Sequence, residues 1–212
     1  MGGVYNSGNL DVYCYSLNNP VKYVDPDGNA TKLNVGEESV VRLAKAGARV
    51  IEDPEYRKGG GGHRNNQNPE ATWCNQATFD IIEATGVDIT KFTLKGGREQ
   101  TRANDVVARM INESIKGNLT VVDAKTAQEL ANKGYTVVAG AMGKRVNSNG
   151  ILESGHVAVV APSDIRAFDE KKGPMVYHVG GGTNGIKTVL KAFGKYYFED
   201  VKYFYDPKQK IK

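Results

Sequence analysis

The sequence predicts an α+β domain in which N-terminal helices pack on an antiparallel sheet. Apolar residues recur at helical spacing through much of residues 37–132, whereas β-branched and aromatic runs divided by turn residues dominate residues 135–205. Helices that precede a block of strands are typical of α+β folds, in contrast to alternating βαβ units. The 212 residues leave room for one such domain and a short appendage.

The first thirty residues form this appendage. They are dense in Tyr, Asn, Asp, Gly and Pro, which is a strand-and-turn composition with few helix formers. Residues 13–15 and 21–24 are expected to be short strands, and Asp25 to Gly28 a tight turn. A segment of this size buries too little apolar surface to fold alone. We therefore divide the chain into a segment at residues 1–30 and a domain at residues 31–212.

Amphipathic spacing predicts four helices, at residues 37–50, 75–85, 103–114 and 123–132. Gly47 weakens the end of the first. Four consecutive glycines and a polar run at residues 57–69 predict a loop between the first and second helices. Because this loop leads into Trp73 and Cys74, the cysteine is expected at a helix N-terminus, and Gly86 is expected to end that helix.

Four strands are predicted, at residues 135–141, 156–161, 175–179 and 196–205. Gly, Pro, Asn and Ser separate these runs, as expected for turns between antiparallel strands. The tyrosines of the last run, at Tyr196, Tyr197, Tyr203 and Tyr205, are interpreted as alternating packing within one strand. They lack the basic stripe that would accompany a base-stacking surface.

Charge and composition exclude several classes of function. A net charge of +4, from 28 Lys and Arg against 24 Asp and Glu, is too mild to predict a nucleic-acid-binding surface. No apolar run reaches the roughly 18 to 20 residues of a membrane helix, and residues 1–9 lack the apolar stretch of a secretory signal. Neither cysteine, Cys14 or Cys74, has zinc-type spacing. We expect no nucleic-acid partner, no membrane insertion and no metal.

Cys74, His156 and His178 form the strongest constellation for catalysis. A helix N-terminus favours a thiolate, an imidazole can accept the thiol proton, and a third polar residue can orient that imidazole. His156 begins one predicted strand and His178 lies on the next. The alternative is that Cys74 is a small buried apolar residue and His156 a strand-end residue without a task.

Further candidates flank this constellation. Trp73 can form a wall of a substrate cleft or pack in the core. Asn184, in a glycine-rich turn after His178, is a second candidate for orienting His156. His63, in the glycine-rich loop, is interpreted as a solvated loop residue.

Residues 13–28 closely resemble the end of the RHS-repeat-associated core, whose signature is Tyr-x-Tyr-x-x-Asn-Asn-Pro-x-x-x-x-Asp-Pro-x-Gly. In that family the signature marks the junction between a repeat shell and a variable C-terminal domain, often a toxin. The resemblance covers only the first thirty residues. It implies that the rest of the chain is an effector domain.

Residues 70–200 resemble papain-like cell-wall amidases and peptidases of the NlpC and CHAP kind. The resemblance rests on the order of five motifs: Cys74-Asn75-Gln76, Ala103-Asn104-Asp105, Ala131-Asn132-Lys133-Gly134, Gly155-His156-Val157-Ala158-Val159-Val160 and Val176-Tyr177-His178-Val179-Gly180. It implies a papain-like fold with Cys74 as nucleophile, His156 as general base and then acid, and His178 as the orienting residue. Trp73, Asn75 and Asn184 would contact the substrate.

Together these resemblances imply a cysteine hydrolase that cleaves amide bonds in peptidoglycan peptides as an RHS-type toxin effector. It would need no cofactor, and its partners would be the peptide substrate and an immunity protein. A larger secretion machine would deliver it to the periplasm or cell wall of a target cell. Two alternatives remain open: a protease, deamidase or transglutaminase-like toxin acting on a protein, and a binding module with a structural Cys74.

Overall fold

The computed structural model describes residues 37–56, 73–146, 150, 152–163, 168–180 and 183–211. The RHS-like segment at residues 1–30 and the glycine-rich loop with His63 lie outside these ranges. The helices are α2 (Glu37–Glu52), α3 (Cys74–Ala84), α4 (Ala103–Ile115), α5 (Ala124–Asn132) and α6 (Val189–Phe193). The strands are β1 (Thr120–Val122), β2 (Val137–Ala141), β3 (His156–Val160), β4 (Met175–His178), β5 (Gly185–Thr188) and β6 (Lys202–Tyr205).

The six strands form one sheet in the order β1-β6-β2-β3-β4-β5, and every neighbouring pair is antiparallel. The predicted α+β class is therefore confirmed. The four predicted helices are also confirmed as α2 to α5, and three of the four predicted strands as β2, β3 and β4. Gly86 follows α3 with a φ of 74°, a conformation that suits glycine and ends the helix there.

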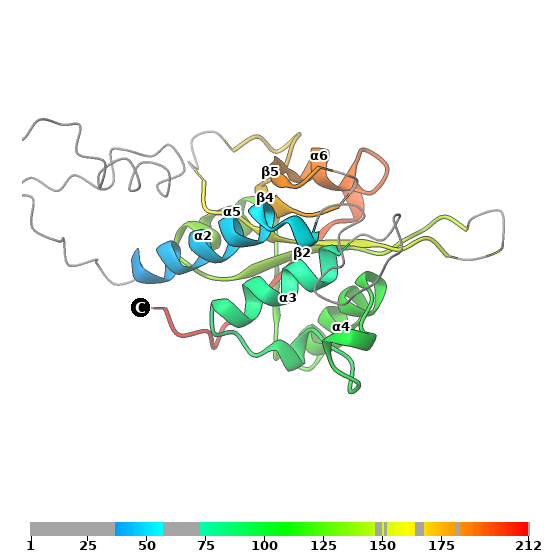
Figure 1. The fold of residues 1–212 in the computed structure, drawn as a ribbon, viewed down its shortest axis with the longest axis horizontal. Coiled ribbons are helices and arrows are strands. Elements are labelled where there is room, and N and C mark those ends of the chain that lie inside the picture. The colour runs from blue at the N-terminus through cyan, green and yellow to red at the C-terminus, as the bar shows by residue number, and fades with distance from the viewer. Residues whose placement is uncertain are drawn as a thin grey trace, which may run out of the picture.

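Helices cover both faces of the sheet (Figure 1). On one face, α2, α3 and α4 lie next to one another, with Tyr177 of β4 packed against Gly47 of α2. On the same face, Gly140 of β2 lies under Met110 of α4, where an added Cβ would come within 2.9 Å of the methionine methyl group. The other face carries α5, against β2, β3 and β6, and α6, against β4 and β5.

The centre of the sheet is buried on both faces. All five residues of β2 are buried, and so are the last four of β3. This explains why the sequences of both strands are continuous apolar runs, as expected for strands covered by helices on each side. Only the first residue of β3, His156, is partly exposed, so the strand ends at the boundary between core and solvent.

The predicted strand at residues 196–205 is wrong in its first half. Only Lys202–Tyr205 is a strand, and Phe198–Asp200 is a 3-10 helix. Tyr196 is 51% exposed, and its ring stacks edge to face on Tyr197, so these two tyrosines pack on each other outside the sheet. Aromatic residues have strand propensity in general, but packing partners decide whether a strand forms.

Within the described ranges, two strands and one α-helix were not predicted. The first strand, β1, has only three residues, and its pairing with β6 joins segments more than eighty residues apart. The short β5 begins at Gly185, a residue with weak strand propensity, and α6 follows it directly with Thr188 as the N-cap. Elements this short carry too few residues to show a period.

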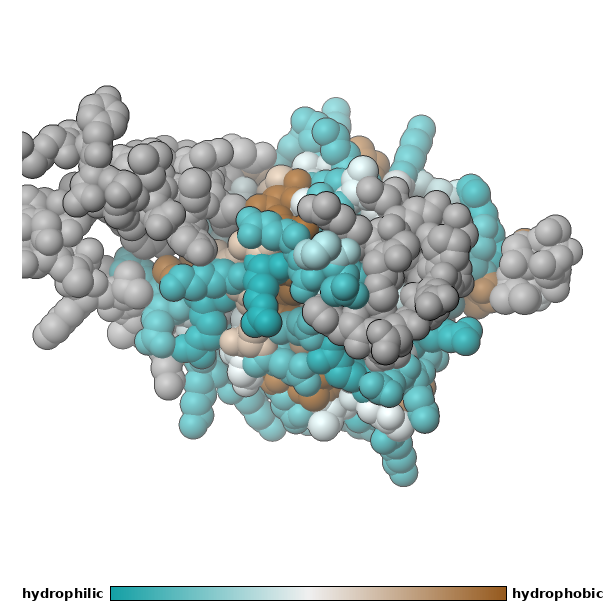
Figure 2. Space-filling view, viewed as in Figure 1, coloured by the Kyte–Doolittle hydropathy of each residue, from teal (hydrophilic) through white to brown (hydrophobic). Residues whose placement is uncertain are grey.

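The surface of the described part of the chain is largely hydrophilic on the face that Figure 2 presents, with hydrophobic residues in small separate patches. Within the described ranges, no helix combines the length and the apolar character needed to cross a membrane.

Candidate active site

Cys74 is the first residue of α3, as predicted, and its side chain is buried. The helix begins after Trp73, whose carbonyl accepts the first intrahelical hydrogen bond, from Ala77 N–H at 2.9 Å. The backbone N–H groups of the first turn of a helix have no intrahelical acceptor. Cys74 therefore combines a thiol with a backbone N–H that has no acceptor within the helix, at the positive end of a helix dipole.

The Cys74 thiol lies near the start of β3, the strand that begins at His156. The backbone N–H of Val157, which directly follows His156 in β3, lowers the pKa of the thiol, whereas no hydrogen bond joins the thiol to His156 among the described residues. Burial raises the pKa of the Cys74 thiol above its ordinary value, and the N–H groups of Val157, Asn75 and Cys74 itself act in the opposite direction. The structure thus brings the predicted nucleophile to the start of the strand that carries the predicted base.

His156 and His178 face each other across the β3–β4 end of the sheet. His156 Nε2 lies 3.1 Å from His178 Nδ1, and His178 Nε2 lies 3.0 Å from the Gly180 carbonyl oxygen. A carbonyl oxygen can only accept, so His178 Nε2 carries the proton and its Nδ1 is an acceptor. His156 must then donate from Nε2, which leaves its Nδ1 as the unprotonated nitrogen.

Both imidazoles are held neutral. Burial, the neighbouring His178 and the Lys187 ammonium lower the pKa of His156 to about 3. Burial and Lys187 lower the pKa of His178 to about 4, against a smaller opposite effect of the Gly180 carbonyl. A neutral His156 with a free Nδ1 is the protonation state that a general base requires.

The geometry distinguishes the two predicted candidates for orienting His156, which are His178 and Asn184. His178 makes the hydrogen bond to His156. Asn184 instead accepts from Gly180 N–H through its Oδ1 at 3.4 Å, and its buried Nδ2 has no hydrogen-bond partner among the residues that the structure describes. Asn184 therefore supports the turn that carries the acceptor of His178, and keeps one donor unused.

The other two predicted substrate contacts, Trp73 and Asn75, both make contacts within the protein. Trp73 is 7% exposed and belongs to the hydrophobic core. Asn75 donates from Nδ2 to the Thr101 carbonyl at 2.6 Å, which ties the first turn of α3 to the segment before α4. Their observed contacts hold the start of α3 in place.

A polar network on the outer side of α3 also holds that helix, and it was not predicted from the sequence. Arg98 donates to Asp80, to Glu83 at 2.7 Å and to Gln76 Oε1 at 3.1 Å, all on α3. Tyr56, at the end of the segment after α2, donates to the same Asp80. Residues 56, 80 and 98 are far apart in sequence, so only the folded chain reveals the network.

Lys187 and Phe193 complete the surroundings of the histidine pair and were not predicted. The Phe193 ring of α6 packs edge to face on His156, with ring centroids 4.7 Å apart. Lys187 lies on β5 and pairs with Val176 of β4, which is two residues before His178 in the chain. Its Nζ donates to Thr183 Oγ1 at 2.6 Å. The unpredicted elements β5 and α6 carry both residues, so there was no pattern from which to place them.

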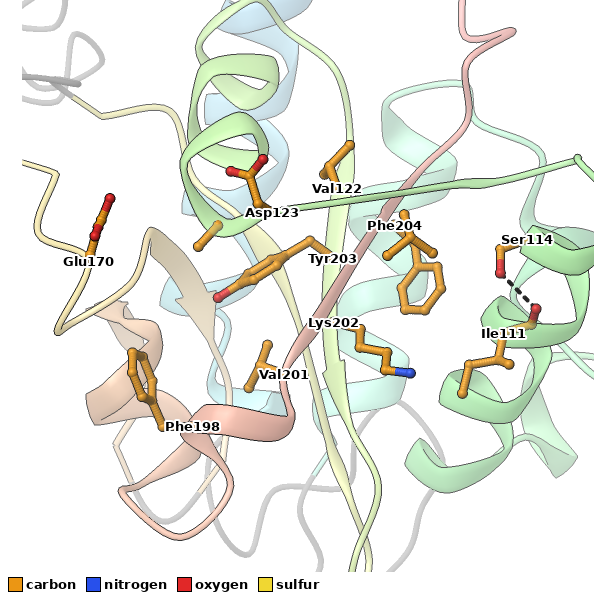
Figure 3. Close-up of a pocket in the computed structure, with 12 residues that line it drawn as sticks. Ile111, Ser114, Val122, Asp123, Glu170, Phe198, Val201, Lys202, Tyr203 and Phe204 are labelled. Carbon is orange, nitrogen blue, oxygen red and sulfur yellow. Dashed lines mark hydrogen bonds between the residues drawn. The ribbon is translucent and has the colours of Figure 1, made fainter.

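A cavity of about 430 Å³ lies away from this site, at the β1–β6 edge of the sheet (Figure 3). Ile111 of α4, Asp123 before α5 and Tyr203 of β6 are among its lining residues, and none of the predicted site residues is. Asp123 is occupied as the N-cap of α5, where it accepts from Thr126 N–H at 2.8 Å. Lys202 and Tyr203 point to opposite sides of β6 (Figure 3). This cavity brings together no catalytic constellation.

Among the residues that the structure describes, no three His, Cys, Asp or Glu side chains gather to hold a metal ion. Comparison with known protein families and with curated proteins found no family model and no curated relative that matches this chain. Cys74, His156 and His178 are therefore the residues that bear on a function.

Proposed function

We propose that this chain is a papain-like cysteine amidase or peptidase that cleaves amide bonds in peptidoglycan peptides. The observation that carries the proposal is the directed hydrogen-bond chain from His156 through His178 to the Gly180 carbonyl. It leaves His156 Nδ1, the ring nitrogen nearer the backbone, as a free base. The backbone N–H of the next residue, Val157, acts on the Cys74 thiol, so the thiol lies near the start of β3.

In the proposed first step, Cys74 Sγ attacks the carbonyl carbon of the scissile amide while the thiol proton moves to His156 Nδ1. The C–N bond of the tetrahedral intermediate then breaks as the imidazolium returns the proton to the leaving amine, and a thioester remains. In the second step His156 removes a proton from water, whose oxygen attacks the thioester. Collapse of this intermediate releases the acid and restores the thiol.

The pKa shifts favour a neutral resting pair over a preformed thiolate–imidazolium pair. Burial raises the pKa of the Cys74 thiol and lowers that of His156. The proton therefore moves as the substrate carbonyl is attacked, and His156 acts as a true general base. The free Cys74 N–H at the helix start is the proposed donor to the developing oxyanion.

The cell-wall substrate and the toxin role rest on the resemblances of the sequence. The RHS-like segment at residues 1–30 supports an effector domain that a larger machine delivers to a target cell, where it would act in the periplasm or cell wall. A net charge of +4 suits an anionic wall polymer. The same Cys and His chemistry also serves proteases, deamidases and transglutaminases, so the substrate needs a direct test.

The test incubates the chain with purified sacculi and, separately, with isolated stem peptides, and looks for new free amines by mass spectrometry. We expect amine release that Cys74→Ala and His156→Ala abolish. As a matched control, Lys45→Ala changes an α2 residue on the exposed surface and should retain activity. No product from either substrate, together with a mass change on a cytosolic protein, would favour the protein-directed alternative.

A separate measurement addresses the alternative that Cys74 is only structural. Iodoacetamide should modify Cys74 of the folded chain at pH 7 more slowly than it would a preformed thiolate, because the thiol is buried and neutral and reacts with His156 as its base. His156→Ala should slow this reaction further, at least about tenfold, because the base is lost. A structural cysteine would resist the reagent in both proteins until they unfold. Equal rates in the two proteins would remove His156 from its proposed role.

A further inference from the structure

Asn104, the second residue of α4, connects the two arms of the β2–β3 hairpin: the segment that follows β2 and the segment that leads to His156 at the start of β3. Its Oδ1 accepts from Gly143 N–H at 2.9 Å on the arm after β2 and from Gly155 N–H at 2.8 Å on the arm before β3. Its Nδ2 donates to the Glu153 carbonyl at 3.2 Å. One side-chain amide thus makes three hydrogen bonds to the backbone at the point where β2 and β3 separate.

The glycines at this point permit the close approach. A Cβ on Gly155 would overlap the Ala141 carbonyl oxygen and lie 2.5 Å from Asn104 Oδ1, and a Cβ on Gly143 would overlap the Glu153 carbonyl. Ala141 and His156 form the last pair of the β2–β3 ladder. The hairpin therefore leaves the sheet through a junction that admits no side chain at either glycine.

The helix that presents Asn104 is itself fixed. Asp105 accepts from Arg102 N–H at 2.9 Å and so caps the start of α4. Ala103 is buried, and Met110 of the same helix packs over Gly140 of β2. Within the motif Ala103-Asn104-Asp105, one residue packs, one binds the hairpin and one caps the helix.

We infer that Asn104 is a positioning residue for His156. It holds the backbone of Gly155, the residue before His156, against the end of β2, and thereby sets where the imidazole emerges from β3. Its importance for catalysis rests on the function proposed above. Its effect on His156 does not, because the histidine can be observed directly.

The opposite end of β3 provides a matched control. Gln128 of α5 donates from Nε2 to the Ala161 carbonyl at 2.8 Å and accepts from Met175 N–H at 2.9 Å, so it joins the end of β3 to the start of β4. It is the same kind of amide bridge on the same strand, but far along the strand from His156. Its loss should loosen the sheet without moving the imidazole.

The experiment follows the histidine ring nitrogens by NMR from pH 5 to 8 in wild type, Asn104→Leu and Gln128→Leu. In wild type the His156 ring should stay neutral and protonated on Nε2 across this range, because its pKa lies at about 3. In Asn104→Leu we expect the ring to titrate within the range, with its pKa raised by at least about two units toward 6.5 as it gains solvent. Gln128→Leu should keep the wild-type behaviour.

If Asn104→Leu does not fold, Gly155→Ala is the second variant, since its methyl group forces the same junction apart with a smaller change of side chain. A wild-type titration of His156 in a folded Asn104→Leu or in Gly155→Ala overturns the inference, and so does an equal shift in Gln128→Leu. Iodoacetamide modification of Cys74 is measured on the same samples. An unreactive wild-type Cys74 would count against the proposed function, and the NMR result would still decide the role of Asn104.

Discussion

His156 Nε2 lies 3.1 Å from His178 Nδ1, and the Gly180 carbonyl on the far side of His178 fixes which ring donates. The third residue of this site is thus a neutral acceptor. A carboxylate in that place would offset the charge of an imidazolium, whereas a neutral ring only orients it. This agrees with the low pKa of His156 and explains why the resting pair is expected to be neutral.

His178→Leu should lower the rate of Cys74-dependent amide hydrolysis at pH 7 by at least about tenfold, or roughly 1.4 kcal/mol in activation free energy. Leu removes the acceptor of the His156 Nε2 proton, so the ring loses its fixed tautomer. His178→Asn retains an acceptor oxygen and should keep more of the activity. Steady-state kinetics of the two variants on stem peptides compares them, and equal losses would argue against an orienting role.

The free energy of unfolding should fall as the pH is lowered from 7 toward 4. The folded pKa values of His156 and His178, about 3 and about 4, lie below the ordinary value of 6.5. In this window the unfolded rings bind protons that the folded rings do not, which stabilises the unfolded state. The expected loss is at most about 1.4 kcal/mol per pH unit for each ring, measured by urea unfolding at several pH values.

A variant that carries both His156→Gln and His178→Asn provides the comparison for this pH dependence, since neither new side chain titrates. Its stability should change less between pH 7 and pH 5 than that of wild type. Parallel curves for the two proteins would mean that other groups cause the acid sensitivity.

Lys187→Met should raise the pKa of both histidines, because the ammonium group of Lys187 lowers each of them in the wild-type protein. NMR titration of the ring nitrogens measures the change. Lys191→Met is the matched control. Lys191 lowers the pKa of Lys187, as burial also does, but it does not act on the two histidines. A larger effect of Lys191→Met than of Lys187→Met would contradict this assignment.

Gly47→Ala should destabilise the protein by about 1 to 3 kcal/mol through overpacking, although alanine is about 1 kcal/mol better than glycine in an exposed helix. The reason is that a Cβ at Gly47 would overlap the Tyr177 ring. Urea unfolding measures the change. In a Tyr177→Leu background the same substitution should be neutral or stabilising, and an unchanged penalty there would show that the ring is not its cause.

The site could be predicted only in part. The helix start at Cys74 and the strand start at His156 follow from local patterns, so both residues could be placed on their elements before the structure was known. His178 and Asn184 remained alternatives until the ring contact between His156 and His178 was visible. Lys187, Phe193 and the hairpin contacts of Asn104 could not be derived, because β5 and α6 are too short to show a period and Asn104 reaches Glu153 across 49 residues of chain.

The sequence by itself determined the α+β class, four helices, three central strands and the elements that carry Cys74 and His156. These features depend on local periodicity and on buried apolar runs, which neighbouring residues express without the rest of the chain. Only the tertiary structure decided the pairing of β1 with β6, the loss of Tyr196 and Tyr197 from the sheet, and the direction of the proton chain through His178. Such features depend on which distant groups meet, and hydrogen bonds and packing between distant residues leave no period in the sequence.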